Sequence, residues 1–447
     1  MERLPEDHAV TYEAVFRSRR AVLPDGERPA AVAVRDGRIA AVGDYDAPFA
    51  AASEEDLAAL PLLPGLVDSH VHVNEPGRTE WEGFATATRA AAAGGVTTIV
   101  DMPLNSLPPT LDPAALAVKR EAARGKVYTD VGFWGGAVPE NLGRLAPLRQ
   151  AGVVGFKCFT ADSGVDEFPP LTPEQLRGAL EECAAIDATL IVHAEDADVL
   201  DAAAPASRSF ADFVASRPAE AEVLAVRRVV AAALVADARV HILHLSAAEA
   251  AAEVASARAA GVKVTAETCP HYLTLSAEEV PDAATEYKCC PPVRDADNRE
   301  ALWTALSRGV IDSVVSDHSP CTPQLKAGDF AAAWGGISSL QLGLPLVWTH
   351  AAPRGHTLRD VCRWMADAPA RLIGSRRKGR IAVGRDADLV AFDPDRRWTV
   401  RAEELFHRHP ITPYEGMTLT GAVEAAWLRG RRVADAPAGR LLSKEDI

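Results

Sequence analysis

The chain has 447 residues, which exceeds the roughly 250 of a typical single barrel domain and leaves enough chain for a second domain. Its 47 basic and 62 acidic side chains give a formal net charge of −15, so neither a nucleic acid nor an anionic membrane surface is expected as a partner. A hydrophobic fraction of 48% suffices for a large core. Any ligand is expected to be neutral or to be held by local charges.

The cysteines and the N-terminal residues indicate the cellular compartment of the protein. The seven cysteines form no C-x-x-C pair and lie mostly in apolar or strand-like segments, as expected for buried, reduced thiols. Residues 1–7 contain no signal-peptide core, and no run of about 18 apolar residues occurs anywhere. We therefore expect a cytoplasmic protein without a membrane segment.

The two ends of the chain share a β-strand pattern. Residues 31–43 alternate apolar and polar side chains around an Asp36-Gly37 hairpin turn. Neither end is long enough to form a sound core alone, so we predict one small β-sandwich domain built from residues 1–62 and 378–447. The pattern recurs in residues 379–392, with a turn at Gly384-Arg385-Asp386, and in residues 422–434, with a turn at Arg429-Gly430-Arg431.

Between these ends, over residues 63–377, short apolar runs alternate with longer alanine-rich helical stretches. Strands that alternate with helices indicate a parallel sheet, and eight repeats predict closure into a (β/α)8 barrel. An open doubly wound sheet would need a glycine-rich phosphate loop after its first strand, and residues 72–77 (HVNEPG) are no such loop. The expected strands lie near residues 64–72, 96–101, 128–132, 153–159, 189–194, 240–245, 262–267 and 311–316. The expected helices lie near residues 82–93, 113–124, 139–150, 173–186, 219–236, 247–259 and 298–307, with another after Ile337.

Metal-binding residue types occur at the ends of these strands. His70 and His72 are two residues apart in the first strand, so both imidazoles point to one side and can reach one metal ion. Active sites of such barrels form at the carboxyl ends of the strands. The other candidate ligands, which end or interrupt strands four, five, six and eight, are Lys157, His193, His244 and Asp317.

Lys157 is unusual because it lies within the apolar run Phe156-Lys157-Cys158-Phe159. Burial favours the neutral amine over the cation, and a neutral amine can add carbon dioxide to give a carbamate whose two oxygens can bridge two metal ions. The alternative is a lysine that extends to the barrel mouth or binds a substrate anion.

These segments resemble the cyclic amidohydrolases of the amidohydrolase superfamily, which include dihydroorotase, dihydropyrimidinase (hydantoinase) and allantoinase. Residues 71–84 (VHVNEPGRTEWEGF) are most similar to the allantoinase group. Residues 101–106 (DMPLNS), 155–159 (GFKCF) and 163–169 (SGVDEFP) fit the same group. The resemblance covers nearly the whole chain and implies both the barrel and the flanking β-sandwich.

The resemblance implies a site with two divalent metal ions, most simply zinc, although manganese, cobalt and iron suit the same ligands. His70, His72, carboxylated Lys157 and Asp317 would hold one ion, and the same carbamate with His193 and His244 would hold the other. A hydroxide that bridges the two ions would attack a ring amide of allantoin and give allantoate, with Asp317 also acting as general acid and base. Members of the family are commonly homotetramers.

Positions that differ between family members bear on the substrate. Dihydroorotases carry an arginine where this chain has Asn74, which suits an uncharged substrate and disfavours dihydroorotate. Hydantoinases carry a tyrosine where this chain has Asp162, which cannot donate a hydrogen bond when ionised, and this difference argues against a hydantoinase. Asp162 itself could equally be a solvated loop carboxylate. The family pattern assigns Asn74, Cys290 and Gly336 to substrate binding. Cys290 and Gly336 would act through their backbone groups. Cys290 and Gly336 could equally be structural turn residues.

Several other readings stay open or are discounted. A hydantoinase, then a dihydroorotase, are the alternative enzymes, and an inactive scaffold of the same fold is the alternative class. The presence of all six ligand types argues against the scaffold. His241 and His318 are expected to point away from the metal ligands, and His271 to organise its loop.

Overall fold

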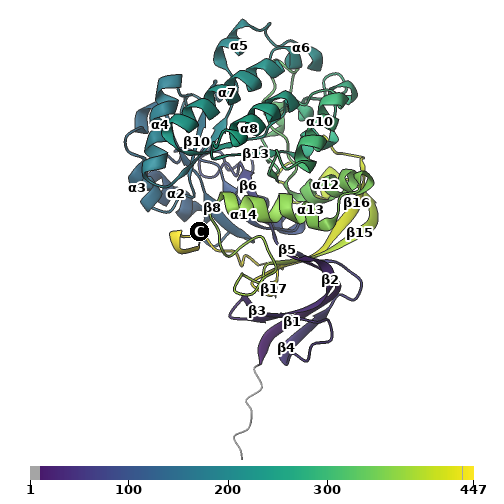
Figure 1. Cartoon of the computed structure of the whole chain (residues 1–447). Helices are drawn as coiled ribbons and strands as arrows, with labels where there is room; N and C mark the ends of the chain where they lie inside the picture. Colours follow the sequence, from purple (N-terminus) through teal and green to yellow (C-terminus); the bar gives the residue numbers. More distant parts are fainter. Residues whose placement is uncertain (1–10, 435, 447) are drawn as a thin grey trace, which may run out of the picture.

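The computed structural model describes residues 11–434 and 436–446. A barrel with surrounding helices forms the upper part of the molecule, and a sheet built from both ends of the chain forms the lower part (Figure 1). His8 and the first ten residues of the predicted sheet domain lie outside the described residues. None of the helices described is long and apolar enough to cross a membrane.

All eight predicted barrel strands form, in the predicted order, and adjacent strands are parallel. The third strand and the fourth are joined by a hydrogen bond from the Val154 N–H to the Phe133 carbonyl (2.9 Å). A parallel bridge between Val71 and His318 connects the last strand back to the first and closes the barrel. The barrel strands are β6 (Leu66–Val71), β7 (Val96–Asp101), β8 (Asp130–Phe133), its short continuation β9 (Gly135–Gly136), β10 (Phe156–Phe159), β11 (Thr189–His193), β12 (Arg239–Ile242), β13 (Val264–Thr268) and β14 (Ser313–Val314).

The predicted helices also form. Several begin at a side chain that caps a free backbone N–H: Asp112 accepts from Ala115 at α2, and Thr172 forms a capping box with Gln175 at α4. The predicted helices are α1 (Phe84–Ala93), α2 (Pro113–Ala123), α3 (Leu145–Gln150), α4 (Pro173–Ala185), α7 (Ala219–Ala236), α8 (Ala248–Ala259), α10 (Ala296–Ser307) and α12 (Gly343–Ala351). Shorter helices that the sequence pattern did not indicate are α5 (Ala197–Ala202), α6 (Phe210–Ala215), α9 (Pro270–Thr274), α11 (Pro323–Lys326), α13 (Leu358–Cys362) and α14 (Ala368–Leu372).

The terminal sheet joins both ends of the chain, as predicted. Strand β5 connects them, because it pairs with β1 through Ala21 and Leu62 and with β15 through Leu389 and Pro64. The sheet therefore extends past the predicted boundary at residue 62, and the domain limits stay a prediction. Its strands are β1 (Tyr12–Leu23), β2 (Gly26–Arg35), β3 (Arg38–Gly43), β4 (Ala51–Asp56), β5 (Leu62–Pro64), β15 (Leu389–Thr399), β16 (Thr418–Leu428) and β17 (Arg431–Arg432).

Two of the three predicted turns connect strands. Asp36 and Gly37 join β2 to β3, and Arg429 and Gly430 join β16 to β17, all four with positive φ as this turn type requires. The strand expected before Gly384 is absent, since residues 379–388 form only an isolated bridge between Arg38 and Asp386.

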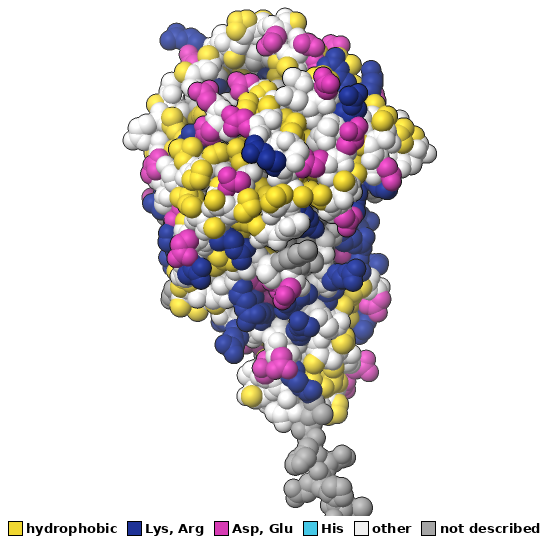
Figure 2. Space-filling model, turned by 90° about the vertical axis from the view of Figure 1, so that its left-hand side faces the viewer, with side chains coloured by type: hydrophobic (Ala, Val, Ile, Leu, Met, Phe, Trp, Pro, Cys, Tyr) yellow, Lys and Arg dark blue, Asp and Glu magenta, His cyan; other side chains and the backbone are white. Residues whose placement is uncertain are grey.

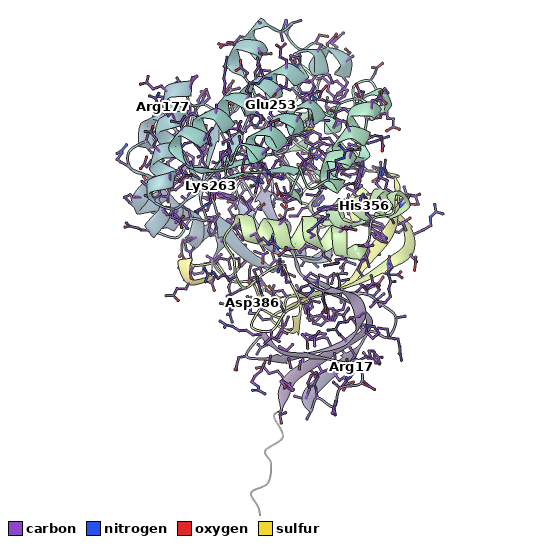
Figure 3. The ribbon with its side chains drawn as sticks, in the orientation of Figure 1. Arg17, Arg177, Glu253, Lys263, His356 and Asp386 are labelled. Atoms are coloured by element: carbon purple, nitrogen blue, oxygen red, sulfur yellow. The ribbon has the colours of Figure 1, made fainter. Side chains whose placement is uncertain are left out.

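A cluster of buried charges occupies the region where the barrel meets the sheet. The Lys378 ammonium contacts carboxylate oxygens of Asp130 (2.6 Å), Asp386 (2.9 Å) and Asp388 (2.7 Å). Asp386 lies between the barrel helices and the lower strands (Figure 3). Lys and Arg side chains also gather on the surface at this level of the molecule (Figure 2).

Candidate metal centre

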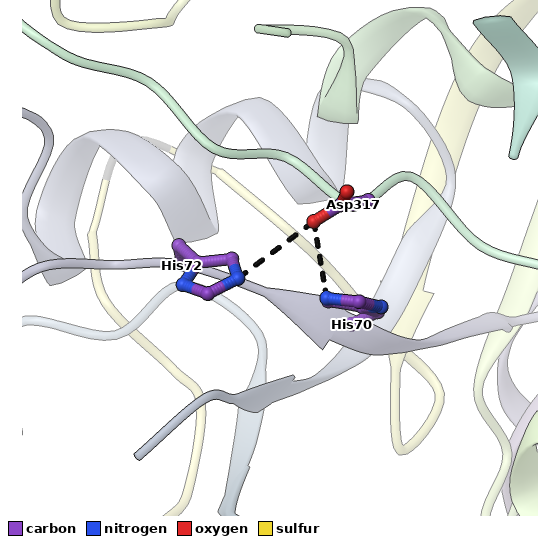
Figure 4. Close-up of side chains that lie close together, drawn as sticks. All are labelled: His70, His72 and Asp317. Carbon is purple, nitrogen blue, oxygen red and sulfur yellow. Dashed lines mark ion pairs between the residues drawn. The ribbon is translucent and has the colours of Figure 1, made fainter. Parts of the chain in front are cut away.

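Three predicted ligands meet at the carboxyl ends of the first and last barrel strands. His70 lies in β6, His72 follows it, and Asp317 follows β14. The Oδ1 atom of Asp317 is 3.0 Å from His70 Nε2 and 3.7 Å from His72 Nε2 (Figure 4). All three side chains are buried, and their donor atoms converge on one small volume.

The remaining predicted ligands line the same cavity, whose volume is about 460 Å³. His193 ends β11 and His244 follows β12, and their rings lie 4.5 Å apart between centroids. The His244 ring is also 5.5 Å from the His70 ring. His244 and Asp317 adopt left-handed backbone conformations (φ 32° and 43°), which are uncommon for residues other than glycine and cluster at functional sites. The structure therefore brings together all six predicted ligands.

A buried glutamate holds the His70 ring. Glu267, at the end region of β13, accepts a hydrogen bond from His70 Nδ1 (2.6 Å) and contacts His241 Nε2 through its other oxygen (3.0 Å). This contact leaves His70 Nε2 as the ring atom that faces Asp317 and His72. His241 therefore points away from the cavity, as predicted, yet it supports the carboxylate that orients a ligand. Such outer carboxylates orient metal-binding histidines.

A second carboxylate holds the His193 ring. Glu195 contacts His193 Nε2 at 2.6 Å, and Arg217 binds both oxygens of Glu195 in a bidentate ion pair. The contact occupies Nε2, so Nδ1 is the His193 nitrogen that could bind an ion. Glu195 and Glu267 were missed by sequence reasoning, although Glu195 lies two residues after His193, the spacing that places side chains on one side of a strand.

The charge distribution favours a cation at this site. Burial opposes protonation of His70, but Asp317 and Glu267 on either side raise its pKa to about 9. Burial lowers the pKa of His72 and of His244 well below the ordinary value, so both rings are neutral and have a lone pair for an ion. His244 Nδ1 is buried without a hydrogen-bond partner among the described residues. Imidazole and carboxylate donors of this kind fit zinc and related divalent ions.

Lys157 is buried without a carboxylate partner among the described residues. Its side chain is 1% exposed and forms no ion pair within the described chain, and its Nζ lies 4.9 Å from the centre of the Phe159 ring. Burial lowers its pKa to about 8, although Asp317 and Glu267 act in the opposite direction. The amine is therefore partly neutral near neutral pH.

Two of the three predicted substrate-binding residues line the cavity. Cys290 and Gly336 line the cavity, and so does Asp162, whose exposed carboxylate accepts a hydrogen bond from the Gly164 N–H. Asn74 is not among the lining residues, because its side-chain amide donates to the Pro320 carbonyl (3.2 Å). Their contacts with a substrate stay predictions.

Comparisons with known proteins agree with this geometry. A model of the amidohydrolase family matches residues 62–433. An allantoinase of Streptomyces avermitilis is 57% identical over 97% of this chain and 99% of its own length. An allantoinase of Saccharomyces cerevisiae is 48% identical over 85% of this chain and 84% of its own length. Among solved structures, an L-hydantoinase (dihydropyrimidinase) from Arthrobacter aurescens superimposes with a TM-score of 0.91 at 30% identity, over 97% of this chain and 100% of its own.

Proposed function

Because the chain belongs to the amidohydrolase family, we propose that it is a cyclic amide hydrolase that opens the ring of allantoin to give allantoate. The observation that carries the proposal is the 57% identity to an allantoinase over nearly the full length of both chains. The solved hydantoinase structure shares the fold at a lower identity of 30%, so it supports the alternative substrate less well.

We assign the metal ligands as the sequence predicts. His70, His72, Lys157 and Asp317 would hold one divalent ion, and His193, His244 and the same modified Lys157 would hold a second. Two such ions, when bound, supply an activated water molecule and stabilise negative charge on the substrate carbonyl oxygen. Zinc suits the ligand set, as do manganese, cobalt and iron.

Asp317 is the proposed proton carrier of the ring-opening step. Burial opposes ionisation of its carboxyl, but the charge and hydrogen bond of the neighbouring His70 imidazole hold its pKa well below the usual range. Asp317 is therefore ionised and can accept a proton from the attacking water. It borders the cavity, so it can donate that proton to the departing ring nitrogen.

Lys157 is proposed to react with carbon dioxide. At pH 7.5 a pKa of about 8 leaves about a quarter of the amine neutral, whereas the ordinary value of 10.5 would leave about 0.1%. The neutral nitrogen forms a bond to the carbon of CO2 and loses one proton to solvent, which gives a carbamate anion. The burial of Lys157 without an ion-pair partner supports this modification.

The cations of the cavity wall support a neutral substrate. Arg217 is paired with Glu195, and the Lys288 ammonium donates to the Ala333 carbonyl (2.6 Å). Both cations therefore have acceptors within the protein, and neither depends on a substrate carboxylate for a partner. The cavity of about 460 Å³ lies within the range for small-molecule sites.

A substrate panel tests the proposal. One metal-loaded sample is assayed with allantoin, hydantoin, dihydrouracil and dihydroorotate under the same conditions, and a metal-free sample serves as the control. We expect allantoin to have the highest kcat/KM, whereas faster turnover of hydantoin or dihydrouracil would refute the substrate assignment. No turnover of any of the four substrates by a fully metal-loaded sample would favour the inactive scaffold.

We further propose a homotetramer in the cytoplasm. All seven cysteines are free thiols and six of them are buried, which supports a reducing compartment. Light scattering combined with size-exclusion chromatography measures the subunit number directly. A mass of one or two chains would contradict the tetramer.

A further inference from the structure

One wall of the cavity is a stretch of main chain rather than a set of polar side chains. Residues 332–336 line it, and among them Gly336 has a φ of 136° that other residues rarely adopt. A Cβ atom on Gly336 would lie 2.1 Å from the Ser319 carbonyl oxygen, so glycine is required at this position. The wall is joined to the segment of Asp317, since the Ser319 N–H donates to the Ile337 carbonyl (3.0 Å).

Two lysines, Lys326 and Lys288, donate hydrogen bonds to the main chain of this wall. The buried Lys326 ammonium donates to the carbonyls of Gly336 (2.7 Å) and Trp334 (2.9 Å). The Lys288 ammonium donates to the Ala333 carbonyl (2.6 Å), and the Lys288 backbone carbonyl accepts from the Gly336 N–H (2.7 Å). The main chain of this wall is therefore held at the carbonyl groups of residues 333, 334 and 336.

Lys326 is an unusual choice for a purely structural contact. Its ammonium is buried, and within the described chain it has only backbone carbonyls as hydrogen-bond acceptors and no carboxylate. Burying a cation without an opposite charge costs free energy, and burial lowers the pKa of this amine to about 8. An apolar side chain of similar length would fill the space without this cost, but it could not set the direction of the carbonyl groups.

We propose that Lys326, together with Lys288, is a positioning residue that holds the main chain of residues 332–336 in the geometry that receives the substrate ring. The ring would contact backbone groups of this wall, so its binding depends on their orientation. The identity of the ring rests on the proposed function, whereas the bracing of the wall does not.

The variant Lys326→Met tests this inference on the metal-loaded full-length protein. We expect KM for the best substrate of the panel to rise about tenfold or more, because hydrogen bonds to a charged group are lost, while kcat changes by less than about threefold. Bound metal should be unchanged, and amide hydrogen exchange in residues 332–337 should become faster. The variant Lys326→Gln keeps one donor and should lie between wild type and Lys326→Met in both measurements.

The control is Lys378→Met, which removes another buried lysine, at the junction of barrel and sheet. It should lower the melting temperature without changing KM or exchange in residues 332–337. Unchanged KM and unchanged exchange in the Lys326 variants would overturn the inference, as would a fall in kcat with an unchanged KM. Failure of wild type to open allantoin would refute the proposed substrate only, because the exchange measurement does not depend on it.

Discussion

Two buried lysines, Lys157 in the barrel and Lys378 where the barrel meets the sheet, have pKa shifts in opposite directions. Lys157 is 1% exposed and Lys378 is 3% exposed, yet the pKa of Lys157 is lowered to about 8 whereas that of Lys378 is raised above its ordinary value. Burial lowers the pKa of both amines. The carboxylates of Asp388, Asp130 and Asp386 reverse the effect at Lys378. Neighbouring carboxylates, rather than burial alone, thus decide whether the pKa of a buried lysine is raised or lowered.

The carboxylates near Lys157 are already committed to other partners. Glu267 contacts His70 and His241, and Asp317 contacts His70. Lys119 is an intermediate case, because it pairs with one carboxylate, Asp101 (2.7 Å), and its pKa is lowered by burial. The number of carboxylates in contact with the amine rises from none at Lys157 to one at Lys119 and three at Lys378.

The largest expected effect is that of Lys157→Ala. Removing the proposed bridge should abolish most metal binding and lower kcat/KM by about a thousandfold or more, since bound metal supplies several kcal/mol of transition-state stabilisation. Metal content and turnover are measured on the same sample. Short carboxylic acids should restore part of the activity because they can replace the missing bridge. Wild-type metal content and turnover in this variant would contradict the assigned role.

The variant Lys378→Met should act on stability instead of chemistry. Asp130 keeps its ion pair with Arg429 and Asp386 keeps one with Arg377, but the buried Asp388 loses its only side-chain cation within the described chain. We therefore expect a loss of about 3–5 kcal/mol in the free energy of unfolding. Chemical denaturation measures the loss, and turnover per folded molecule should remain near wild type. A variant of normal stability but low turnover would reverse the proposed division between the two lysines.

Smaller effects are expected from the carboxylates that orient the histidines. Glu267→Gln should weaken metal binding at the His70 side, and Glu195→Gln at the His193 side, each by about 10–100-fold. Competition with a chelator measures both affinities. Equal metal affinity in both variants and wild type would show that these carboxylates do not support the ligands.

The smallest effect is expected from Asp162→Asn. Asp162 borders the cavity, but its side chain is exposed and bonds only to the nearby Gly164 N–H within the described chain. Substitutions of exposed residues usually change free energies by less than about 0.5 kcal/mol, so kcat/KM should change by less than about threefold. A larger loss would make Asp162 a substrate contact.

The sequence predicted the barrel and the candidate ligands that meet at its mouth because both follow from local patterns. Each barrel strand is an apolar run, and a ligand at the end of a strand necessarily lies at the barrel mouth. Glu267 was missed because its contact with His70 spans 197 positions and leaves no local pattern. Helices α5 and α6 were missed because six residues are too few to show an apolar period.

Other differences arose from tertiary contacts. The strand expected before Gly384 does not form, and Lys378 beside it forms an ion pair with Asp130 of the barrel, a contact that no local propensity describes. Asn74 was assigned to the substrate from the family resemblance, and that contact stays a prediction; its backbone is left-handed (φ 66°) and its side-chain amide donates to the Pro320 carbonyl. The direction of a side chain that depends on one backbone angle cannot be predicted from the sequence pattern.

The central claim is that Lys157 is a carbamate and not an ammonium. Carbon-13 NMR of active, metal-loaded protein prepared with labelled bicarbonate tests it directly, with Lys157→Ala as the control. We predict one carbamate resonance in the wild type that is absent from the variant. A fully metal-loaded and active wild type without that resonance would contradict the account.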